Sequence, residues 1–469
     1  MSINLAECTA SQLIELYKSG QASPVEALKA VEQRIDQYNP AFNAFCHNVS
    51  VERSKLATIS EAKWSAHRKT GAAVGALEGV PTSIKDLILT KGMPTLRGSH
   101  TVDKNQAWDV DAPVSARLKE AGAVILGKTT TPEFGCKGET NSLLTGITRN
   151  PWDSSKTTGG SSGGTAAAVA AGMGPLGVGT DGAGSVRIPA AFCGNFGLKP
   201  SFGRVPAYPL SPFGSVAHLG PHTMGVEDAA RMMNVMALPD ARDWTSLPFD
   251  GVDYLSTLEK GVQGLRIAYS PTLGYAKNVH PEIAASIAAA ATEFEAMGAI
   301  VEQVDPGFDD PLDISTGLWF MGTWTIWSGM TAAQQAMVDP DFAAQAALGG
   351  QLSALDIQKL NLRRGALGSH MRQFMQRYDL ILTPAVSIPA FDAKPAGHTP
   401  MSPEAMLGWT PFSYPFNLTQ QPACAMPCGL TKAGLPMSLQ LVGPMFGDAL
   451  VLRAARAYER LHPITRPAL

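Results

Sequence analysis

Two glycine-rich runs, TTGGSSGGTAAAVAAG (residues 157–172) and GVGTDGAGSVRIPAA (residues 177–191), carry three serines and enclose an alanine-rich segment that favours a helix. Glycines ahead of a serine let the backbone approach a substrate closely. Their consecutive N–H groups can also point to one spot, as an oxyanion hole requires. The N–H groups of residues 182–184, just before Ser185, could do this. Either run alone is more typical of an ordinary loop, so its meaning depends on the rest of the chain.

The first run also fits a different catalytic motif. Its segment GSSGG (residues 160–164) matches GxSxG, the nucleophile elbow of α/β-hydrolases, with Ser162 as the nucleophile. That interpretation needs an acid and then a histidine downstream, and His370 and His398 are candidates for the histidine. An α/β-hydrolase-like esterase that uses Ser162 is therefore one alternative.

Two segments match the letters of nucleotide-binding motifs, but their predicted secondary structure differs from what those motifs require. The segment GAVILGKT (residues 122–129) fits the Walker A pattern, but its middle positions predict a strand that follows a helix, whereas a P-loop is a loop between a strand and a helix. The segment GMGPLG (residues 172–177) fits GxGxxG, but it follows the helix-prone alanines and predicts a turn. Neither pattern indicates a nucleotide cofactor.

Helical and strand patterns alternate along the chain. A capping signal at Ser23 predicts an early helix, and a helix–glycine–strand order occurs at 113–126 and again at 281–304. Further strands are expected over 82–89, 380–383, 423–427 and 436–442, and a last helix over 448–461. This alternation predicts an α/β fold with a mixed central sheet covered by helices on both faces.

Length and composition indicate one large domain. The 469 residues are 45% hydrophobic, and no linker-like stretch or charge run divides them. We expect a single domain over 1–469, with a helical N-terminal part at 1–65 and a catalytic core at 70–210. The six cysteines lack metal-site spacing, so we expect neither a metal nor a disulfide framework.

Charge and targeting signals point to a small-molecule partner. The net charge is −3 with no basic block, which disfavours nucleic acid and anionic membranes as partners. The uncharged run over 314–338 is interrupted by polar residues and favours a buried helix rather than a membrane span. The first twenty residues do not resemble a signal peptide, so a cytoplasmic location is expected. The sequence leaves open whether the chain forms a homo-oligomer.

Taken together, the two serine-bearing runs resemble the amidase signature family, whose members use a lysine, a serine in a cis peptide and a nucleophilic serine. The matching residues are Lys85 in GVPTSIKD, Ser161 in GGSSGG and Ser185 in GTDGAGSVRIPA. The resemblance extends to GAVILGKTTTPEF, GITRNPWD, FGLKPSFGRVP, YDLILTPA and the C-terminal QPACAMPCGLTKAGLPMSLQLVG. It covers most of the chain, and the intact set of three argues against a catalytically silent partner protein.

The resemblance implies a role for each residue of the site. Lys85, kept neutral by burial, accepts a proton from Ser161; Ser161 relays one from Ser185, which attacks the amide and forms an acyl-enzyme. The implied oxyanion hole consists of the N–H groups of Gly182, Ala183 and Gly184, although the family usually has a different residue where Ala183 stands. Supporting roles are expected for Ser162, Asp181 and Arg187, the last two as a structural ion pair, and no cofactor is needed.

The substrate is less defined than the chemistry. In the family, glutaminase subunits of tRNA-dependent amidotransferases carry an acidic residue seven positions before the asparagine of a PxN motif, where it binds the amino group of glutamine. Here that position is Thr410, before Asn417 in PFN, which favours a free-standing amidase and leaves the glutaminase as an alternative. Two aromatic groups would make the substrate apolar or aromatic if they line the site rather than the core: Trp319, Phe320, Trp324 and Trp327, and Trp409, Phe412, Tyr414 and Phe416.

Overall fold

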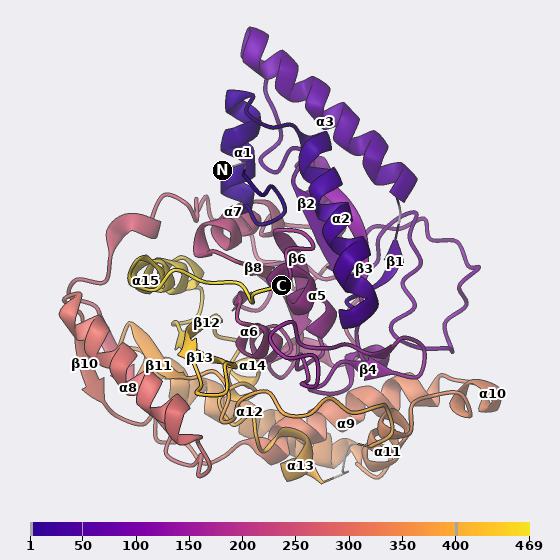
Figure 1. Ribbon diagram of the computed structural model, residues 1–469. Coiled ribbons are helices and arrows are strands. Elements are labelled where there is room, and N and C mark those ends of the chain that lie inside the picture. Colours follow the sequence, from indigo (N-terminus) through magenta and orange to yellow (C-terminus); the bar gives the residue numbers. More distant parts are fainter. Residues whose placement is uncertain (1–2, 49, 399–401) are drawn as a thin grey trace.

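A computed structural model describes residues 3–48, 50–398 and 402–469. In these residues one mixed sheet of eleven strands crosses the molecule, surrounded by helices (Figure 1). In sheet order the strands are β1 (Phe45–Asn48), β3 (Val124–Thr129), β2 (Pro81–Lys85), β6 (Leu176–Asp181), β8 (His218–Thr223), β7 (Phe196–Lys199), β12 (Ala423–Leu430), β13 (Pro436–Val442), β11 (Leu380–Pro384), β9 (Arg266–Tyr269) and β10 (Ile300–Gln303). A second sheet pairs β4 (Asn141–Ser142) with β5 (Gly146–Ile147).

The helices belong to several groups along the chain. They are α1 (Ala10–Ser19), α2 (Pro24–Phe42), α3 (Ser50–Thr70), α4 (Pro113–Glu120), α5 (Gly163–Ala170), α6 (Arg187–Cys193), α7 (Val226–Met236), α8 (Pro281–Ala296), α9 (Leu312–Ser328), α10 (Ala332–Gln335), α11 (Pro340–Gly349), α12 (Ala354–Phe374), α13 (Pro403–Leu407), α14 (Pro415–Leu418) and α15 (Asp448–Leu461). The capping box predicted at Ser23 is present at the start of α2.

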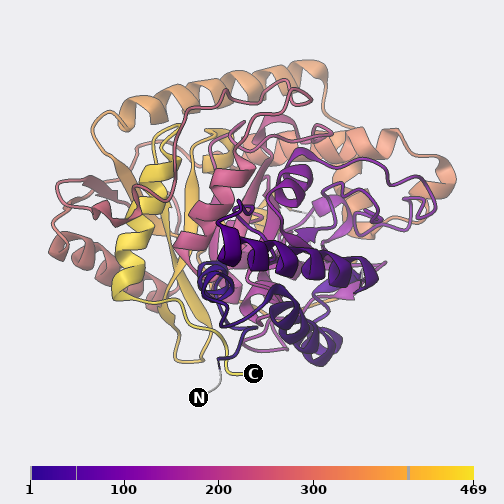
Figure 2. The same ribbon diagram turned by 90° about the horizontal axis from the view of Figure 1, so that it is seen from above.

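Alternate residues of the strands face two different helical layers. In β11, Leu380 and Leu382 belong to one hydrophobic cluster, and Ile381 between them belongs to another. Helices α4, α7, α8 and α15 pack on the first face, and α2, α5, α6 and α12 pack on the second. Figure 2 shows α15 and α12 on opposite sides of the strands. The predicted α/β fold, with a mixed sheet covered on both faces, is confirmed.

Two local predictions differ from the structure. The strand expected over 82–89 ends at Lys85, because the Ile88 N–H turns back to donate to the Lys85 carbonyl at 3.0 Å. The N-terminal part is helical as expected, but it also contains β1, which pairs antiparallel with β3 at one edge of the sheet. The early end of β2 matters for the site, because it makes Lys85 the last residue of the strand, at its carboxyl end.

Both nucleotide-like motifs have the structure expected of their context. The middle positions of GAVILGKT form strand β3, which follows helix α4, so no phosphate-binding loop exists there. The GMGPLG segment ends helix α5, where Gly172 has φ 72° and the Met173 N–H donates to the Ala168 carbonyl at 2.8 Å. Both predictions from context are confirmed.

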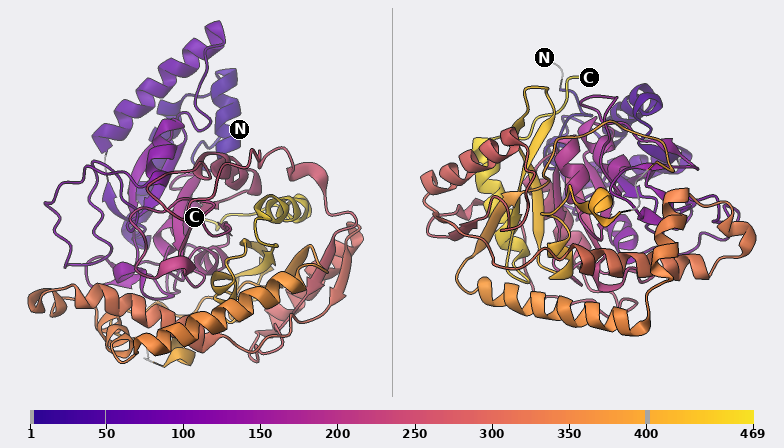
Figure 3. Two further views of the ribbon diagram at one scale, coloured as in Figure 1. Left: turned by 180° about the vertical axis from the view of Figure 1, so that it is seen from behind. Right: turned by 90° about the horizontal axis from the view of Figure 1, so that it is seen from below.

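The uncharged run over 314–338 becomes helix α9 and the short α10. Among the described residues, no helix combines the length and hydropathy that crossing a membrane requires. Figure 3 shows α9 and the long α12 on the side of the molecule opposite the N-terminal helices α1–α3. Helix α9 brings Trp319 against the loop that carries Ser185, because a Cβ on Gly182 would lie 2.6 Å from the Trp319 ring.

Candidate active site

The ends of two neighbouring parallel strands position the site. Strands β2 and β6 pair in parallel, so their carboxyl ends reach the same edge of the sheet. Lys85 is the last residue of β2, and Asp181 is the last residue of β6. In β2, Ile84 packs into the hydrophobic cluster on the first face, and the next residue therefore points to the opposite face, where α5 lies.

Helix α5 lies unusually close to the sheet because β6 presents glycines to it. A Cβ on Gly177 would lie 2.4 Å from a methyl carbon of Thr165, and one on Gly179 would lie 2.7 Å from the Ser162 hydroxyl. Only glycine permits this approach. The close packing brings Ser161 and Ser162, at the start of α5, down to the ends of β2 and β6. The Gly160–Ser161 peptide bond is cis, as the family resemblance implied.

Lys85 is surrounded by three hydroxyl groups. Its Nζ lies 2.7 Å from Ser161 Oγ, 3.0 Å from Ser162 Oγ and 2.8 Å from Thr180 Oγ1. Ser162 Oγ also lies 3.1 Å from the Thr180 carbonyl, to which its own proton is directed. A neutral amine has two N–H donors and one lone pair. Donation to Ser162 and Thr180 therefore leaves the lone pair for the proton of Ser161.

Burial favours this neutral form of Lys85. The side chain is fully buried, and its loss of hydration lowers its pKa well below the ordinary value, against the opposing charge of Asp181. No carboxylate lies within ion-pair distance of Nζ among the described residues. Lys85 can therefore act as a base, and Ser161 is the hydroxyl placed to give it a proton.

Asp181 and Arg187 form a fully buried ion pair that shapes the loop of residues 182–186, which carries Ser185. Arg187 Nε lies 3.0 Å from Asp181 Oδ2, and Nη2 lies 3.1 Å from Oδ1. Burial alone would raise the pKa of the Asp181 carboxyl, but the guanidinium and its hydrogen bonds hold it well below the usual range. The carboxylate also accepts the N–H groups of Gly184 and Val186 at 2.7 and 3.1 Å. The predicted structural ion pair therefore fixes the backbone on both sides of Ser185.

One of the three expected oxyanion donors is already engaged. The Gly184 N–H donates to Asp181 Oδ1, so it is not free to bind a substrate oxygen, and the expectation for Gly184 is corrected. In the described part of the chain, the N–H groups of Gly182, Ala183 and Ser185 have no acceptor. These three remain available for an oxyanion. Gly184 instead contributes its backbone conformation, with φ 122°.

The alternative nucleophile Ser162 is poorly placed for attack. Its side chain is fully buried, and its Oγ is held by Lys85 and by the backbone of Thr180. The histidines considered with it lie elsewhere: His370 Nε2 is 2.7 Å from the Pro306 carbonyl, and His398 pairs with Glu139 at 3.3 Å. The structure thus does not support the esterase interpretation, and Ser162 is a support for Lys85.

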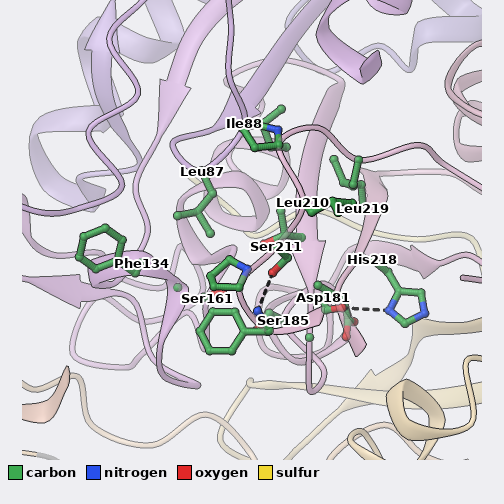
Figure 4. Close-up of a pocket in the computed structure, with 18 of the residues that line it drawn as sticks. Leu87, Ile88, Phe134, Ser161, Asp181, Ser185, Leu210, Ser211, His218 and Leu219 are labelled. Atoms are coloured by element: carbon green, nitrogen blue, oxygen red, sulfur yellow. Dashed lines mark hydrogen bonds between the residues drawn. The ribbon is translucent and has the colours of Figure 1, made fainter. Parts of the chain in front are cut away.

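Ser185 lies between two chambers. The large chamber, of about 190 Å³, is walled by Leu87, Ile88, Phe134, Tyr208, Leu210, Phe213, Leu219, Trp319 and Ile326, and both Ser161 and Ser185 reach it (Figure 4). The small chamber, of about 30 Å³, is lined by Ala183, Ser185, Ile188, Trp319, Met406, Leu407 and Trp409, with residues 136–139 closing it. Ser161 lines only the large one. Figure 4 also marks the bond between His218 Nδ1 and the Asp181 carbonyl, at 3.2 Å.

The aromatic residues left open by the sequence divide between site and core. Trp319 lines both chambers and stacks on Phe213 with ring centres 4.0 Å apart, and Trp409 lines the small chamber. The four fully or largely buried core members are Phe320, Phe412, Tyr414 and Phe416. Trp324 and Trp327 line neither chamber. Phe134, Tyr208 and Phe213 also line the large chamber, and nothing in the sequence indicated this.

Thr410, the position compared with glutaminase subunits, lines neither chamber. It is fully buried, and its hydroxyl donates to the Leu407 carbonyl at 2.8 Å. The site also contains residues that the sequence analysis missed. Asn417 Oδ1 accepts a hydrogen bond from Arg187 Nη2 at 2.6 Å, and Asn417 Nδ2 donates to Asp181 Oδ1 at 2.8 Å. Gln440 Oε1 accepts a hydrogen bond from Arg187 Nη1 at 2.8 Å. The PFN motif was the one signal that could have indicated Asn417.

Acidic, cysteine and histidine side chains offer no metal centre near these chambers. Among the described residues, no group of three such side chains is arranged to hold an ion. The groups near Ser185 that suit acyl transfer are the buried amine of Lys85, the hydroxyls of Ser161 and Ser162, and the free backbone N–H groups.

Comparison with known proteins points to one family. The family model described as Amidase matches residues 26–452. The chain is 36% identical over 467 residues to an acylamidase of Rhodococcus erythropolis, covering 98% of this chain and 96% of that protein. It is 34% identical over 491 residues to a glutamyl-tRNA(Gln) amidotransferase subunit of Myxococcus xanthus, covering 99% of both.

The fold leads to the same family. The structure of a bacterial aryl acylamidase described as an amidase signature enzyme matches with a TM-score of 0.89 and 31% identity, covering 97% of this chain and 96% of that one. A 6-aminohexanoate cyclic dimer hydrolase in complex with its substrate matches with a TM-score of 0.87 and 27% identity, covering 99% of both. The chain belongs to the amidase signature family and is an amidohydrolase.

Proposed function

We propose that this protein hydrolyses short-chain N-acyl amides of small apolar or aromatic amines through an acyl-enzyme on Ser185. The observation that carries the proposal is the position of Ser161, which contacts the buried amine of Lys85 on one side and lines the large apolar chamber on the other. Its partner is a small-molecule amide, and no cofactor takes part.

The bond between Lys85 Nζ and Ser161 Oγ supports the inner step of the proton path, and the resemblance to the amidase signature family implies the step between Ser161 and Ser185. Ser185 Oγ attacks the amide carbon while its proton passes to Ser161, whose own proton moves to the neutral Lys85. The oxyanion that forms is bound by the free N–H groups of Gly182, Ala183 and Ser185. When the C–N bond breaks, Lys85 returns its proton through Ser161 to the departing nitrogen. Water then attacks the ester and releases the carboxylic acid and the free serine.

The return of the proton to the departing nitrogen requires one orientation of the substrate in the site. The departing nitrogen must lie next to Ser161, and Ser161 lines the large chamber but not the small one. The amine portion therefore occupies the large chamber, whose walls are mainly aliphatic and aromatic. The acyl portion extends to the small chamber, which has room for about two or three water-sized groups. This favours acetyl or propionyl amides over longer acyl chains.

Some of the related proteins agree with this orientation of the substrate, and others suggest a different function. An acylamidase and an aryl acylamidase are among them, which agrees with an aromatic amine in the large chamber. Amidotransferase subunits are also among them, so a glutaminase is the competing function. Against it, Thr410 is uncharged and its hydroxyl is occupied by the Leu407 carbonyl, so it cannot neutralise the ammonium of glutamine.

A substrate panel tests the proposal. The purified protein is incubated with 4-nitroacetanilide, with the matching hexanoyl anilide, with phenylacetamide and with glutamine, beside a Ser185→Ala control. We expect 4-nitroaniline release from the acetyl compound, at least tenfold slower release from the hexanoyl compound, and none from the control. Preferential turnover of phenylacetamide would reverse the proposed orientation. Turnover of glutamine alone would replace the proposal with the glutaminase.

A further inference from the structure

One charged side chain in the large chamber takes no part in the mechanism. Arg97 lines this chamber together with Leu87, Ile88 and Phe134. Its backbone is fixed: its N–H donates to the Asp86 carbonyl at 3.0 Å, and its own carbonyl accepts the Phe134 N–H at 2.8 Å. Its φ is 58°, a conformation that non-glycine residues rarely adopt. The turn thus holds Arg97 at the chamber wall.

Among the described residues, the guanidinium of Arg97 has no hydrogen-bond or ion-pair partner. None of its nitrogens is among the buried polar atoms that are sealed from solvent without a partner. Burial disfavours its charged form and lowers its pKa, and Asp86 partly opposes this. Asp86 does not neutralise it, because no ion pair joins them and the Asp86 carboxyl accepts the Leu96 and Gly98 N–H groups instead, at 3.2 and 3.4 Å.

The other charges of the large chamber are already matched. Asp181 is neutralised by Arg187, and His218 directs Nδ1 to two carbonyl oxygens. Arg97 is thus a half-buried cation beside the apolar residues Leu87, Ile88 and Phe134, without a counter-ion from the described part of this chain. An arginine presents a planar fork of N–H donors that fits a carboxylate with two parallel hydrogen bonds.

We propose that Arg97 binds a carboxylate carried by the amine portion of the substrate, so that the preferred substrates are N-acyl derivatives of aromatic amino acids of the aminobenzoate type. This inference rests on the proposed function, because it places the amine portion in the large chamber. A carboxylate on the ring would supply the counter-ion that Arg97 lacks, while the ring itself packs against the apolar walls. Arg97 acts in substrate selection and takes no part in bond making.

The test compares substrates that differ in charge and hardly in shape. 4-Acetamidobenzoate carries a carboxylate where 4-nitroacetanilide carries a neutral, planar nitro group, and 3-acetamidobenzoate carries it at the neighbouring ring position. The measured quantity is the ratio of kcat/KM for the better carboxylate to kcat/KM for the nitro compound, so that intrinsic reactivity cancels between variants. We expect Arg97→Gln to lower this ratio about tenfold or more, mainly through KM. Arg97→Lys should restore part of it.

Two results separate this inference from the proposed function. If the wild-type protein cleaves 4-nitroacetanilide but Arg97→Gln leaves the ratio within about twofold, the role of Arg97 is refuted and the proposed function stands. If the wild-type protein cleaves no anilide at all, the proposed function itself fails. A variant that fails to fold is recognised by loss of Ser185 labelling with a fluorophosphonate, and Arg97→Lys then provides the comparison.

Discussion

Replacing Asp181 with asparagine tests whether the buried ion pair holds the loop that carries Ser185. The side chains of Asp181 and Arg187 are both fully buried, and the change leaves the guanidinium without its counter-ion. Breaking a buried pair from one side costs about 3–5 kcal/mol. The backbone donors at Gly184 and Val186 also lose a charged acceptor. We therefore expect Asp181→Asn to lower the free energy of unfolding by about 3–5 kcal/mol in urea titrations near pH 7.

An exposed ion pair provides the matched control. Arg363 and Asp313 are joined by two hydrogen bonds, but their side chains are 55% and 57% exposed. Asp313→Asn should cost no more than about 1 kcal/mol. A loss below about 1 kcal/mol for Asp181→Asn, or equal losses for the two variants, would refute the reasoning.

The same variant has a pH signature. The folded-state pKa of Asp181 is depressed, so the stability it contributes is present above its unfolded pKa of about 3.9 and is lost as the pH falls through the lower, folded value. The difference between wild type and Asp181→Asn should thus persist across neutral pH and narrow only in acid. Asp181 also raises the pKa of Lys85, so the acid limb of kcat/KM should move to lower pH in the variant.

Three further predictions concern the base, the loop and an N-terminal cap. Because Lys85 must be neutral, kcat/KM for an anilide should rise with pH along a limb below the ordinary lysine value of about 10.4, and Lys85→Arg should lower kcat by about 10²–10⁴. At Gly184, with φ 122°, an alanine Cβ would lie 2.5 Å from Ser413 Cβ, so Gly184→Ala should cost at least about 1–3 kcal/mol and most of the activity. Gly365→Ala in helix α12, where no atom lies within 4 Å of the added carbon, should be neutral or stabilising in the same urea assay. Asp228 accepts the first N–H groups of helix α1 at 2.7 and 2.9 Å, so Asp228→Ala should lower the free energy of unfolding by about 1–2 kcal/mol; an unchanged midpoint would contradict this capping role.

Much of the site could be predicted because its key residues lie in short motifs at strand and helix ends. Lys85 and Ser161, expected from the resemblance, are 2.7 Å apart, and the glycines of the second run hold the loop that carries Ser185. The pattern of helix and strand signals also located most elements to within a few residues. The boundary of β2 was missed because a turn, held by the bond from the Ile88 N–H to the Lys85 carbonyl, interrupts an otherwise apolar run.

Other parts depended on contacts that no local pattern encodes. Asn417 and Gln440 reach Arg187 across 230 and 253 positions of the chain, through strands and helices that only the folded sheet brings together. The role of Gly184 depended on whether its N–H faces a substrate or Asp181, which spacing cannot decide. Arg97 likewise lacks a partner among the described residues because the Asp86 carboxylate accepts the Leu96 and Gly98 N–H groups instead, which no local pattern predicts.

The identity of the nucleophile is the central claim, and mass spectrometry tests it most directly. The protein is reacted with a fluorophosphonate and digested, and the modified serine is located by peptide sequencing, beside Ser185→Ala and Ser162→Ala. We predict one adduct on Ser185, its absence in Ser185→Ala and its retention in Ser162→Ala. An adduct on Ser162 or Ser161 in the wild-type protein, or labelling that persists in Ser185→Ala, would contradict Ser185 as the nucleophile.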